Sequence, residues 1–385
     1  MRGIFISQAV LNKNNGGGQF VRSLIGLLKK VVGEENLTVV SLPDENDTAK
    51  HYREEKNLIV YEADPSKLEM AINVVSRCPR YVGRIIFDKI VTEIKNGKYD
   101  FAFLGFSTYQ YLIEKIKKEP SIPVYVMYQG VTPNTKMSRL VNATLWQRIK
   151  AYPSFKLVLE RESVVADLSD CNIVHNERDR NAFYKYYQKE PDMYLPVFIA
   201  DKFKNMESLV NPGYEGFSLL FIGSKFGPNL SGLKWFVENV MPHTNQDVHL
   251  YVVGQGMEFL REEPLYQQDK IHIIGEVEEL EPWYYYADLV VEPIFEGDGM
   301  KTKTVEAMMF GKTILGTEEA FCGYVGLDQY LCNTAKEFLN SIEKYRIQGV
   351  PKTNYAVRKV YLEKYSEDAV LGEMRKAIEK HVNGR

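Results

Sequence analysis

Short apolar runs alternate with amphipathic stretches through the first half of the chain. The apolar runs have the length of strands, and the stretches between them space their apolar residues as a helix packed on one face does. The expected strands are residues 4–6, 37–41, 58–61, 101–104 and 124–128, and the expected helices include 20–32, 67–75 and 109–116. This alternation predicts parallel sheets covered by helices.

The alternation restarts after a turn-rich join, Asn-Pro-Gly-Tyr-Glu-Gly at residues 211–216. Further strands are expected at 218–222, 249–253, 271–274, 289–292 and 313–317. Because 385 residues exceed the size at which single hydrophobic cores stop growing, the pattern predicts two α/β domains, residues 1–205 and 217–362, joined by a linker at 206–216. A last helical segment lies within 363–385. A ligand site is expected in a cleft between the domains.

One strand-to-helix connection concentrates polar chemistry. After an apolar run, residues 292–312 read Glu-Pro-Ile-Phe-Glu-Gly-Asp-Gly-Met-Lys-Thr-Lys-Thr-Val-Glu-Ala-Met-Met-Phe-Gly-Lys. Backbone N–H groups at the helix start, together with Lys301 and Lys303, suit phosphates. A carboxylate such as Glu306 only accepts hydrogen bonds, so it suits sugar hydroxyls. A nucleotide-sugar carries both groups and is the ligand that this segment predicts.

This segment resembles the donor site of glycosyltransferases with the GT-B fold, especially those of family four. That family carries two acidic residues separated by seven others, and the second opens the triplet Glu-Ala-Met. Asp298 and Glu306 have this spacing, and Gly311 follows the triplet, although the first acid is Asp where the family usually has Glu. The resemblance implies an α/β fold of two Rossmann-like domains whose parallel sheets face an interdomain cleft. It also implies that the C-terminal helix in 363–385 crosses back onto the N-terminal domain.

Other motifs of the second half occur in the order that the family shows. They are Phe221-Ile222-Gly223-Ser224 with Pro228-Asn229, Val252-Val253-Gly254-Gln255-Gly256, Ile274-Gly275-Glu276-Val277 and Tyr286-Ala287-Asp288-Leu289. The resemblance implies that the second domain holds the donor and that the first presents the acceptor. The candidate catalytic residues are Asp298, Lys303 and Glu306. The candidate donor-binding residues are Gly16, Gly17, Gly18, Gly223, Ser224, Lys225, Asn229, Gly254, Gly256, Gly297, Gly299, Met300, Lys301, Thr302 and Glu306.

Three consecutive glycines, Gly16 to Gly18, lie between the first strand and the helix that follows it. Glycine loses more chain entropy on folding than any other residue, so a run of three favours a backbone that a ligand approaches closely at a helix start. In the resembling family a Gly-Gly loop at this position faces the cleft. A plain flexible loop is the alternative.

The turn from Gly254 to Gly256 disfavours a dehydrogenase, because a dinucleotide-binding fingerprint needs a third glycine where Phe259 stands. Lys225, Lys301 and Lys303 are the candidates for phosphate contacts. Fixed cations and a helix start would stabilise the charge that develops on a departing pyrophosphate. We therefore expect no metal and no other cofactor.

Gln129 ends the strand at which relatives commonly direct a His or Asp into the cleft, and it is the acceptor-side candidate. Glutamine is a poor proton acceptor, whereas inverting transfer ordinarily needs a general base. The sequence therefore slightly favours a retaining mechanism. Glu160, Glu162 and Glu177 stay open as alternatives for a base.

Composition narrows the partners and the location. The net charge of −3, from 48 basic and 51 acidic residues, argues against nucleic-acid binding. Four cysteines without Cys-x-x-Cys spacing indicate inert thiols in a reducing compartment. The N-terminus has no signal-peptide pattern, and no run approaches the roughly 20 apolar residues of a membrane span. We expect a cytoplasmic protein, soluble or peripheral to the inner face of the membrane.

The stretch Trp-Gln-Arg-Ile-Lys-Ala-Tyr at residues 146–152 is basic and aromatic. Such a stretch can contact an anionic membrane that carries a lipid-linked acceptor. It is short, and Glu160 and Glu162 follow it, so a solvated helix face is the favoured alternative.

These observations predict a glycosyltransferase that moves a sugar from a nucleotide donor, with UDP the expected nucleotide, to a hydroxyl of a glycan or lipid-linked glycan. The resemblance suggests bacterial surface polysaccharide assembly as the setting. Two alternatives remain open. One is a non-hydrolysing nucleotide-sugar epimerase, which shares the two-domain architecture. The other is a non-catalytic glycosyltransferase-like subunit that binds glycan.

Overall fold

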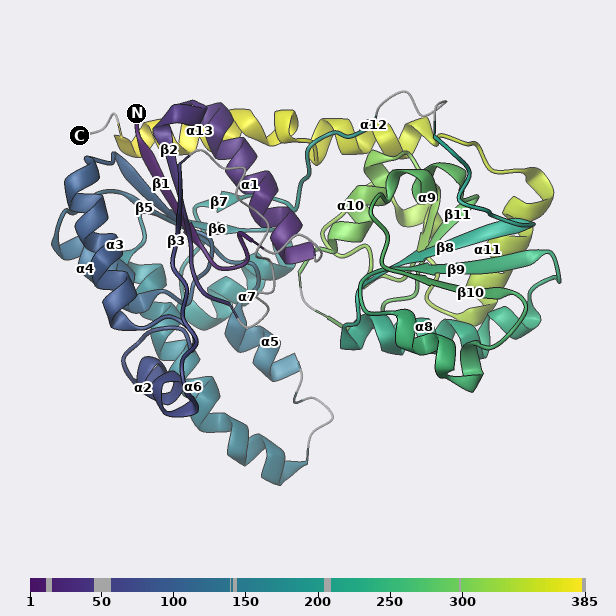
Figure 1. Cartoon of the computed structure of the whole chain (residues 1–385), viewed down its shortest axis with the longest axis horizontal. Helices are drawn as coiled ribbons and strands as arrows, with labels where there is room; N and C mark the ends of the chain where they lie inside the picture. Colours follow the sequence, from purple (N-terminus) through teal and green to yellow (C-terminus); the bar gives the residue numbers. More distant parts are fainter. Residues whose placement is uncertain are drawn as a thin grey trace. The chain divides into compact units, whose positions relative to one another are not determined.

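The computed structural model describes residues 1–11, 16–44, 57–138, 140, 144–203, 209–297 and 299–382. The chain forms two compact units. The first comprises Met1–Lys13, Gly17–Pro196 and Val370–Arg385, and the second comprises Asn14–Gly16 and Val197–Ala369. Each unit is built on its own parallel sheet (Figure 1). The prediction of two parallel α/β sheets is confirmed.

The sheet of the first unit has seven strands in the order β3-β2-β1-β4-β5-β6-β7, all parallel. The strands are β1 (Gly3–Ser7), β2 (Leu37–Ser41), β3 (Leu58–Val60), β4 (Phe101–Leu104), β5 (Val124–Met127), β6 (Cys171–Val174) and β7 (Met193–Tyr194). Every residue of β1, β2, β4, β5 and β6 is buried, whereas the edge strands β3 and β7 are partly exposed. Continuous burial follows from helices on both faces of the sheet.

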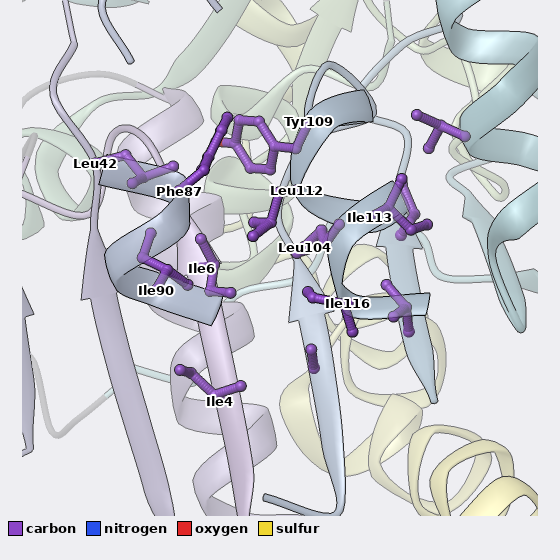
Figure 2. Packing of buried hydrophobic residues seen from close by; sticks show 14 of the residues in the cluster. Ile4, Ile6, Leu42, Phe87, Ile90, Leu104, Tyr109, Leu112, Ile113 and Ile116 are labelled. Atoms are coloured by element: carbon purple, nitrogen blue, oxygen red, sulfur yellow. The ribbon is translucent and has the colours of Figure 1, made fainter. Parts of the chain in front are cut away.

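Seven helices of the first unit follow its strands in chain order. They are α1 (Gly16–Val32), α2 (Lys67–Val75), α3 (Arg84–Gly97), α4 (Gln110–Lys118), α5 (Thr132–Ser138), α6 (Leu145–Leu168) and α7 (Glu177–Tyr187), and a 3-10 turn, Glu34–Asn36, follows α1. One face of the sheet, through Ile4, Ile6 and Leu104, packs on Phe87 of α3 and Ile113 of α4 (Figure 2). Successive side chains along each strand therefore point to opposite faces of the sheet.

The opposite face of this sheet packs on α13 (Glu367–Val382), the last helix of the chain. The hydroxyl of Tyr125 on β5 donates to the Ala377 carbonyl at 3.1 Å, and its ring meets His381 edge-on with the centroids 5.6 Å apart. Val370, Met374 and Ile378 of α13 are buried. The C-terminal helix is thus part of the first unit from residue 370 onward.

The sheet of the second unit has five parallel strands in the order β10-β9-β8-β11-β12. They are β8 (Phe217–Ile222), β9 (Val248–Val253), β10 (Ile271–Gly275), β11 (Leu289–Glu292) and β12 (Ile314–Gly316). The helices are α8 (Gly227–Asn239), α9 (Glu281–Tyr286), α10 (Thr302–Met309), α11 (Ala335–Gln348) and α12 (Tyr355–Lys364), with 3-10 turns at Met241–His243, Glu258–Glu262, Pro264–Tyr266 and Asp328–Tyr330. The strand order places the carboxyl ends of β9, β8 and β11 side by side, where ligands of open α/β sheets bind.

In the described part of the chain, every helix is too short or too polar to cross a bilayer. All four cysteines are free thiols, and burial raises the pKa of Cys78 and Cys171 to about 12. These two thiols are therefore protonated and unreactive at neutral pH.

Candidate functional site

The connection from β11 to α10 contains two glycines with positive φ angles before the helix begins. Gly297 has φ 139° and Gly299 has φ 65°, conformations that other residues rarely adopt. Met300 is buried and its sulfur lies 3.4 Å from the Val197 amide nitrogen. Lys301 is the N-cap of α10, and Thr302 is its first residue. Asp298, a candidate catalytic residue, lies outside the described residues.

Glu306 lies on α10, one turn inside the helix, and only 7% of the residue is exposed. Its Oε2 accepts a hydrogen bond of 2.9 Å from the hydroxyl of Tyr284 on α9. The Tyr284 ring is itself buried and stacks on Phe310 with a centroid separation of 4.8 Å. Burial and the nearby negative charge of Glu306 raise the pKa of Tyr284 well above its usual range, so the phenol remains a donor. The carboxylate is thus held in one orientation.

Lys303 connects α10 to the loop after β8. Its Nζ donates to Asn229 Oδ1 at 2.7 Å, and Asn229 Nδ2 donates to the Ser224 carbonyl at 2.9 Å. The same ammonium lies 4.9 Å from the centroid of the Phe221 ring. Burial lowers the pKa of Lys303, while the negative charge of Glu292 opposes that shift. Three residues that the sequence proposed separately, Ser224, Asn229 and Lys303, therefore meet in one cluster.

Lys301 has a different environment from Lys303. Its Nζ pairs with Glu319 Oε1 at 2.5 Å and donates to the Gly299 carbonyl at 2.8 Å. Because Glu319 forms a direct ion pair with it, Lys301 stabilises the turn and is a weaker candidate for phosphate binding. Lys303 donates instead to the neutral Asn229, although the negative charge of Glu292 also acts on it. Lys225 is exposed, with its Nζ 4.2 Å from the centroid of the Phe259 ring.

The loops after β8 and β9 pack backbone against backbone. A Cβ atom at Gly254, which has φ 150°, would stand 2.1 Å from the Gly223 carbonyl oxygen. The Gly223 amide donates to the Val253 carbonyl at 3.0 Å, and the Lys225 amide donates to the Gln255 carbonyl at 2.9 Å. The glycines of both loops, including Gly256 with φ 73°, therefore lie at one edge of the second sheet.

Glu292 is a buried acid of this site that the motifs did not identify. It ends β11 with 0% exposure, and its Oε2 lies 2.6 Å from the Thr304 hydroxyl. Its Oε1 has no hydrogen-bond partner among the described residues. Burial raises the pKa of Glu292, and the positive charge of Lys303 opposes this. The signal in the sequence was an acid directly after the apolar run Leu289-Val290-Val291.

Gly16, Gly17 and Gly18 form the first turn of α1, so they are helical rather than a loop ahead of the helix. Gln129 follows β5, and its Nε2 donates to the Gly105 carbonyl at 3.1 Å. This hydrogen bond uses the side-chain amide of Gln129, the acceptor-side candidate, to link the ends of β4 and β5.

The three acids considered as a base already have partners. Glu162 is buried and accepts hydrogen bonds from the hydroxyls of Ser107, at 2.6 Å, and Thr132, at 2.5 Å, and from that of Tyr187. Glu160 pairs with Lys156 at 3.8 Å, and Glu177 pairs with Arg180 at 3.0 Å. Burial raises the pKa of Glu162, and its contacts indicate a structural carboxyl that joins α6 to the ends of β4 and β5.

Among the residues that the structure describes, no group of three or more His, Cys, Asp or Glu side chains lies close enough together to hold a metal ion.

Residues 216–345 match the family model described as Glycosyl transferases group 1. An uncharacterized 44.6 kDa protein in the cps region of Klebsiella pneumoniae is 31% identical over 102 residues, which cover 24% of this chain and 26% of that protein. The match thus spans about a quarter of that relative's length.

Solved structures match over nearly the whole chain. Sucrose-phosphate synthase from Thermosynechococcus elongatus superimposes with a TM-score of 0.72 at 14% identity, covering 100% of both chains. HepE from Anabaena, solved in complex with UDP, gives 0.71 at 12% identity and covers 99% of this chain and 100% of its own. WaaG, a glycosyltransferase involved in lipopolysaccharide biosynthesis, gives 0.66 at 16% identity and covers 98% and 99% of the two chains. The chain has the GT-B fold, and its residues 216–345 match the Glycosyl transferases group 1 model.

Proposed function

We propose that this protein, whose residues 216–345 match the Glycosyl transferases group 1 model, transfers a sugar from a UDP-linked donor to a hydroxyl of a glycan or lipid-linked glycan. Surface polysaccharide assembly is the proposed setting. Two neighbours support it: the Klebsiella relative comes from a cps region, and WaaG is involved in lipopolysaccharide biosynthesis. The choice of UDP is supported by the UDP and UDP-glucose complexes of HepE.

The observation that carries the proposal is where Glu306 and Lys303 lie in the second unit, at the junction between α10 and the loop after β8. Both belong to α10, and Lys303 reaches Asn229 in the loop after β8. A carboxylate can only accept hydrogen bonds, so Glu306 would receive those of ribose hydroxyls. An ammonium can only donate, so Lys303 would contact the diphosphate.

In this proposal, bond cleavage leaves negative charge on the departing diphosphate. A fixed ammonium beside it stabilises the transition state more than the ground state, because the charge is larger there. Burial lowers the pKa of Lys303 in the free protein, and an arriving diphosphate would favour the charged form. Lys303 is thus most strongly charged when the leaving group is present, and the protein itself supplies this charge.

We propose a retaining mechanism. Gln129 cannot serve as a general base, and Glu162 is enclosed by three hydroxyl donors. A glycan acceptor would then be deprotonated by the leaving phosphate itself rather than by a protein carboxylate. The configuration of the product, read by NMR immediately after transfer, tests this step, because an inverted product requires a base.

Calorimetric titration with UDP tests the donor site. We expect Glu306→Gln to weaken UDP binding about tenfold or more, since a hydrogen bond to a charged group is worth about 1.5–3 kcal/mol. The matched control is Glu363→Gln, which removes an exposed carboxylate on α12 of the same unit. Equal UDP affinity in both variants would count against the site.

Incubation with a nucleotide-sugar alone distinguishes the reaction classes. A transferase leaves the donor sugar's configuration unchanged when no acceptor is added, whereas an epimerase converts it. A protein without measurable affinity for any nucleotide or nucleotide-sugar tested would instead be a non-catalytic subunit, and the proposal would be wrong.

A further inference from the structure

The N-terminal part of α6 presents apolar side chains to solvent. Every residue from Thr144 to Lys150 is exposed, and Figure 1 shows this end of α6 extending beyond the other elements of the first unit. The exposed fractions are 72% for Leu145, 73% for Trp146, 52% for Ile149 and 62% for Tyr152. The sequence favoured an ordinary solvated helix face here. A solvated face normally exposes polar residues, whereas these four are large and apolar.

The four apolar residues share one side of the helix. At 3.6 residues per turn they occupy about one third of its circumference. Arg148 and Lys150 flank this stripe on either side, and Lys156 continues it one turn further on. Residues 144–159 contain no Asp or Glu, although the whole chain has a net charge of −3. The projecting segment is therefore a local cationic and apolar surface.

The rest of α6 anchors this surface to the body of the unit. Phe155 meets the ring of Tyr186 on α7 edge-on with the centroids 6.1 Å apart, and Lys136 on α5 donates to Ser154 Oγ at 2.9 Å. Pro153 separates the exposed turns from this anchored part. Because proline lacks an N–H, it removes one bond of the helix ladder at this boundary.

We infer that residues 145–156 of α6 dock the first unit onto an anionic lipid surface. An apolar stripe bordered by cations is the arrangement that lies in a membrane interface, with the rings of Trp and Tyr at headgroup depth. The long arms of Arg148 and Lys150 can extend their charges to lipid phosphates while their methylenes follow the stripe, whereas Lys156 pairs with Glu160 at 3.8 Å.

A protein partner fits this surface less well. Four side chains over two turns are a small area against the roughly 800 Å² that each partner buries in a stable protein–protein interface. The absence of acids from residues 144–159 matches a uniformly negative surface, whereas protein interfaces pair both signs of charge.

The test is flotation of the full chain with vesicles of phosphatidylcholine alone and of equal parts phosphatidylcholine and phosphatidylglycerol. We expect binding to the anionic vesicles that weakens at high salt. Ile149→Gln should lower the partition coefficient about tenfold, in line with the loss of a buried aliphatic side chain. Arg148→Gln should lower it about fivefold, as expected for one cation near an anionic surface. Ile347→Gln, an exposed aliphatic on α11 of the second unit, is the matched control and should bind like the parent.

Tryptophan fluorescence locates the contact. Trp146 is exposed, Trp283 is buried and Trp235 packs on Phe295, so a blue shift on vesicle binding should come from Trp146. Trp146→Phe should keep most of the binding and lose the shift.

Three outcomes would overturn the inference: no binding to either vesicle, equal binding by Ile149→Gln and the parent, or a lipid-independent dimer that Ile149→Gln dissociates. The last would assign the surface to a second copy of this chain. Circular dichroism of each variant establishes that a loss of binding does not come from unfolding.

Discussion

The hydrogen bond from Tyr284 to Glu306 should control both the stability of the second unit and its affinity for UDP. Tyr284→Phe removes only the hydroxyl, because the phenylalanine ring can keep the stacking on Phe310 at its interplanar angle of 22°. In the parent, Glu306 Oε2 lies 2.9 Å from the Tyr284 hydroxyl, and only 7% of the Glu306 residue is exposed. The substitution removes this donor from the buried carboxylate. Loss of a hydrogen bond to a charged group costs about 1.5–3 kcal/mol.

The expected effect is measurable by thermal unfolding. A domain of this size loses about 2–4 °C in melting temperature for each kcal/mol, so a fall of roughly 3–12 °C is expected. The affinity for UDP, measured by calorimetry, should fall severalfold as well, because the carboxylate is no longer held in one orientation.

The matched control is Tyr285→Phe. Tyr285 is the next residue on α9 and contacts Lys352 through its ring, with Nζ 4.2 Å from the centroid, so the phenylalanine keeps that contact. If both variants unfolded at the parent temperature and bound UDP equally well, the Tyr284 hydroxyl would not orient Glu306, and the assignment of Glu306 as an oriented hydrogen-bond acceptor would be wrong.

Two further predictions concern charge. Because burial lowers the pKa of Lys303, the affinity for UDP should fall as the pH rises through that lowered pKa. The Lys303→Met variant should bind UDP about tenfold or more weakly and lose this pH dependence. Calorimetry across the pH range would contradict this prediction if the parent and the variant showed the same dependence of affinity on pH. Burial lowers the pKa of His175 from 6.5 to about 4. The neutral His175 therefore makes its full contribution to the free energy of unfolding above pH 6.5. As the pH falls towards 4, the free energy of unfolding should decrease by up to about 3 kcal/mol. Urea denaturation at two pH values, one near neutral and one below the pKa of free histidine, measures this decrease. The His175→Asn variant should lose less stability than the parent between the two. If parent and variant lost the same amount, the acid sensitivity would come from another residue.

The sequence predicted the fold well because the period of its apolar residues reports directly on helices and strands. The strand expected at 289–292 is β11, and the one expected at 218–222 is β8 apart from one residue at its start. Burial on both faces explains this success, since a central parallel strand must be apolar throughout. The glycine run before the first helix was assigned to a loop, whereas Gly16 to Gly18 form the first turn of α1.

The partners within the site could not be predicted from the sequence. Lys303 and Asn229 are 74 residues apart, and Tyr284 and Glu306 are 22 apart, so their contacts depend on how α8, α9 and α10 pack on the sheet. Likewise, the three lysines looked equivalent as phosphate ligands until Glu319 proved to neutralise Lys301. Motif spacing identified the segment, but tertiary packing decides which of its charges already have a partner.

The return of α13 to the first unit has a consequence for synthesis on the ribosome. Tyr125 on β5 is made early, whereas the Ala377 carbonyl that accepts its hydrogen bond is made only after the whole second unit. The part of the sheet face that α13 covers therefore stays uncovered while the whole second unit is translated. During that interval the nascent protein exposes an aromatic surface that chaperones can recognise.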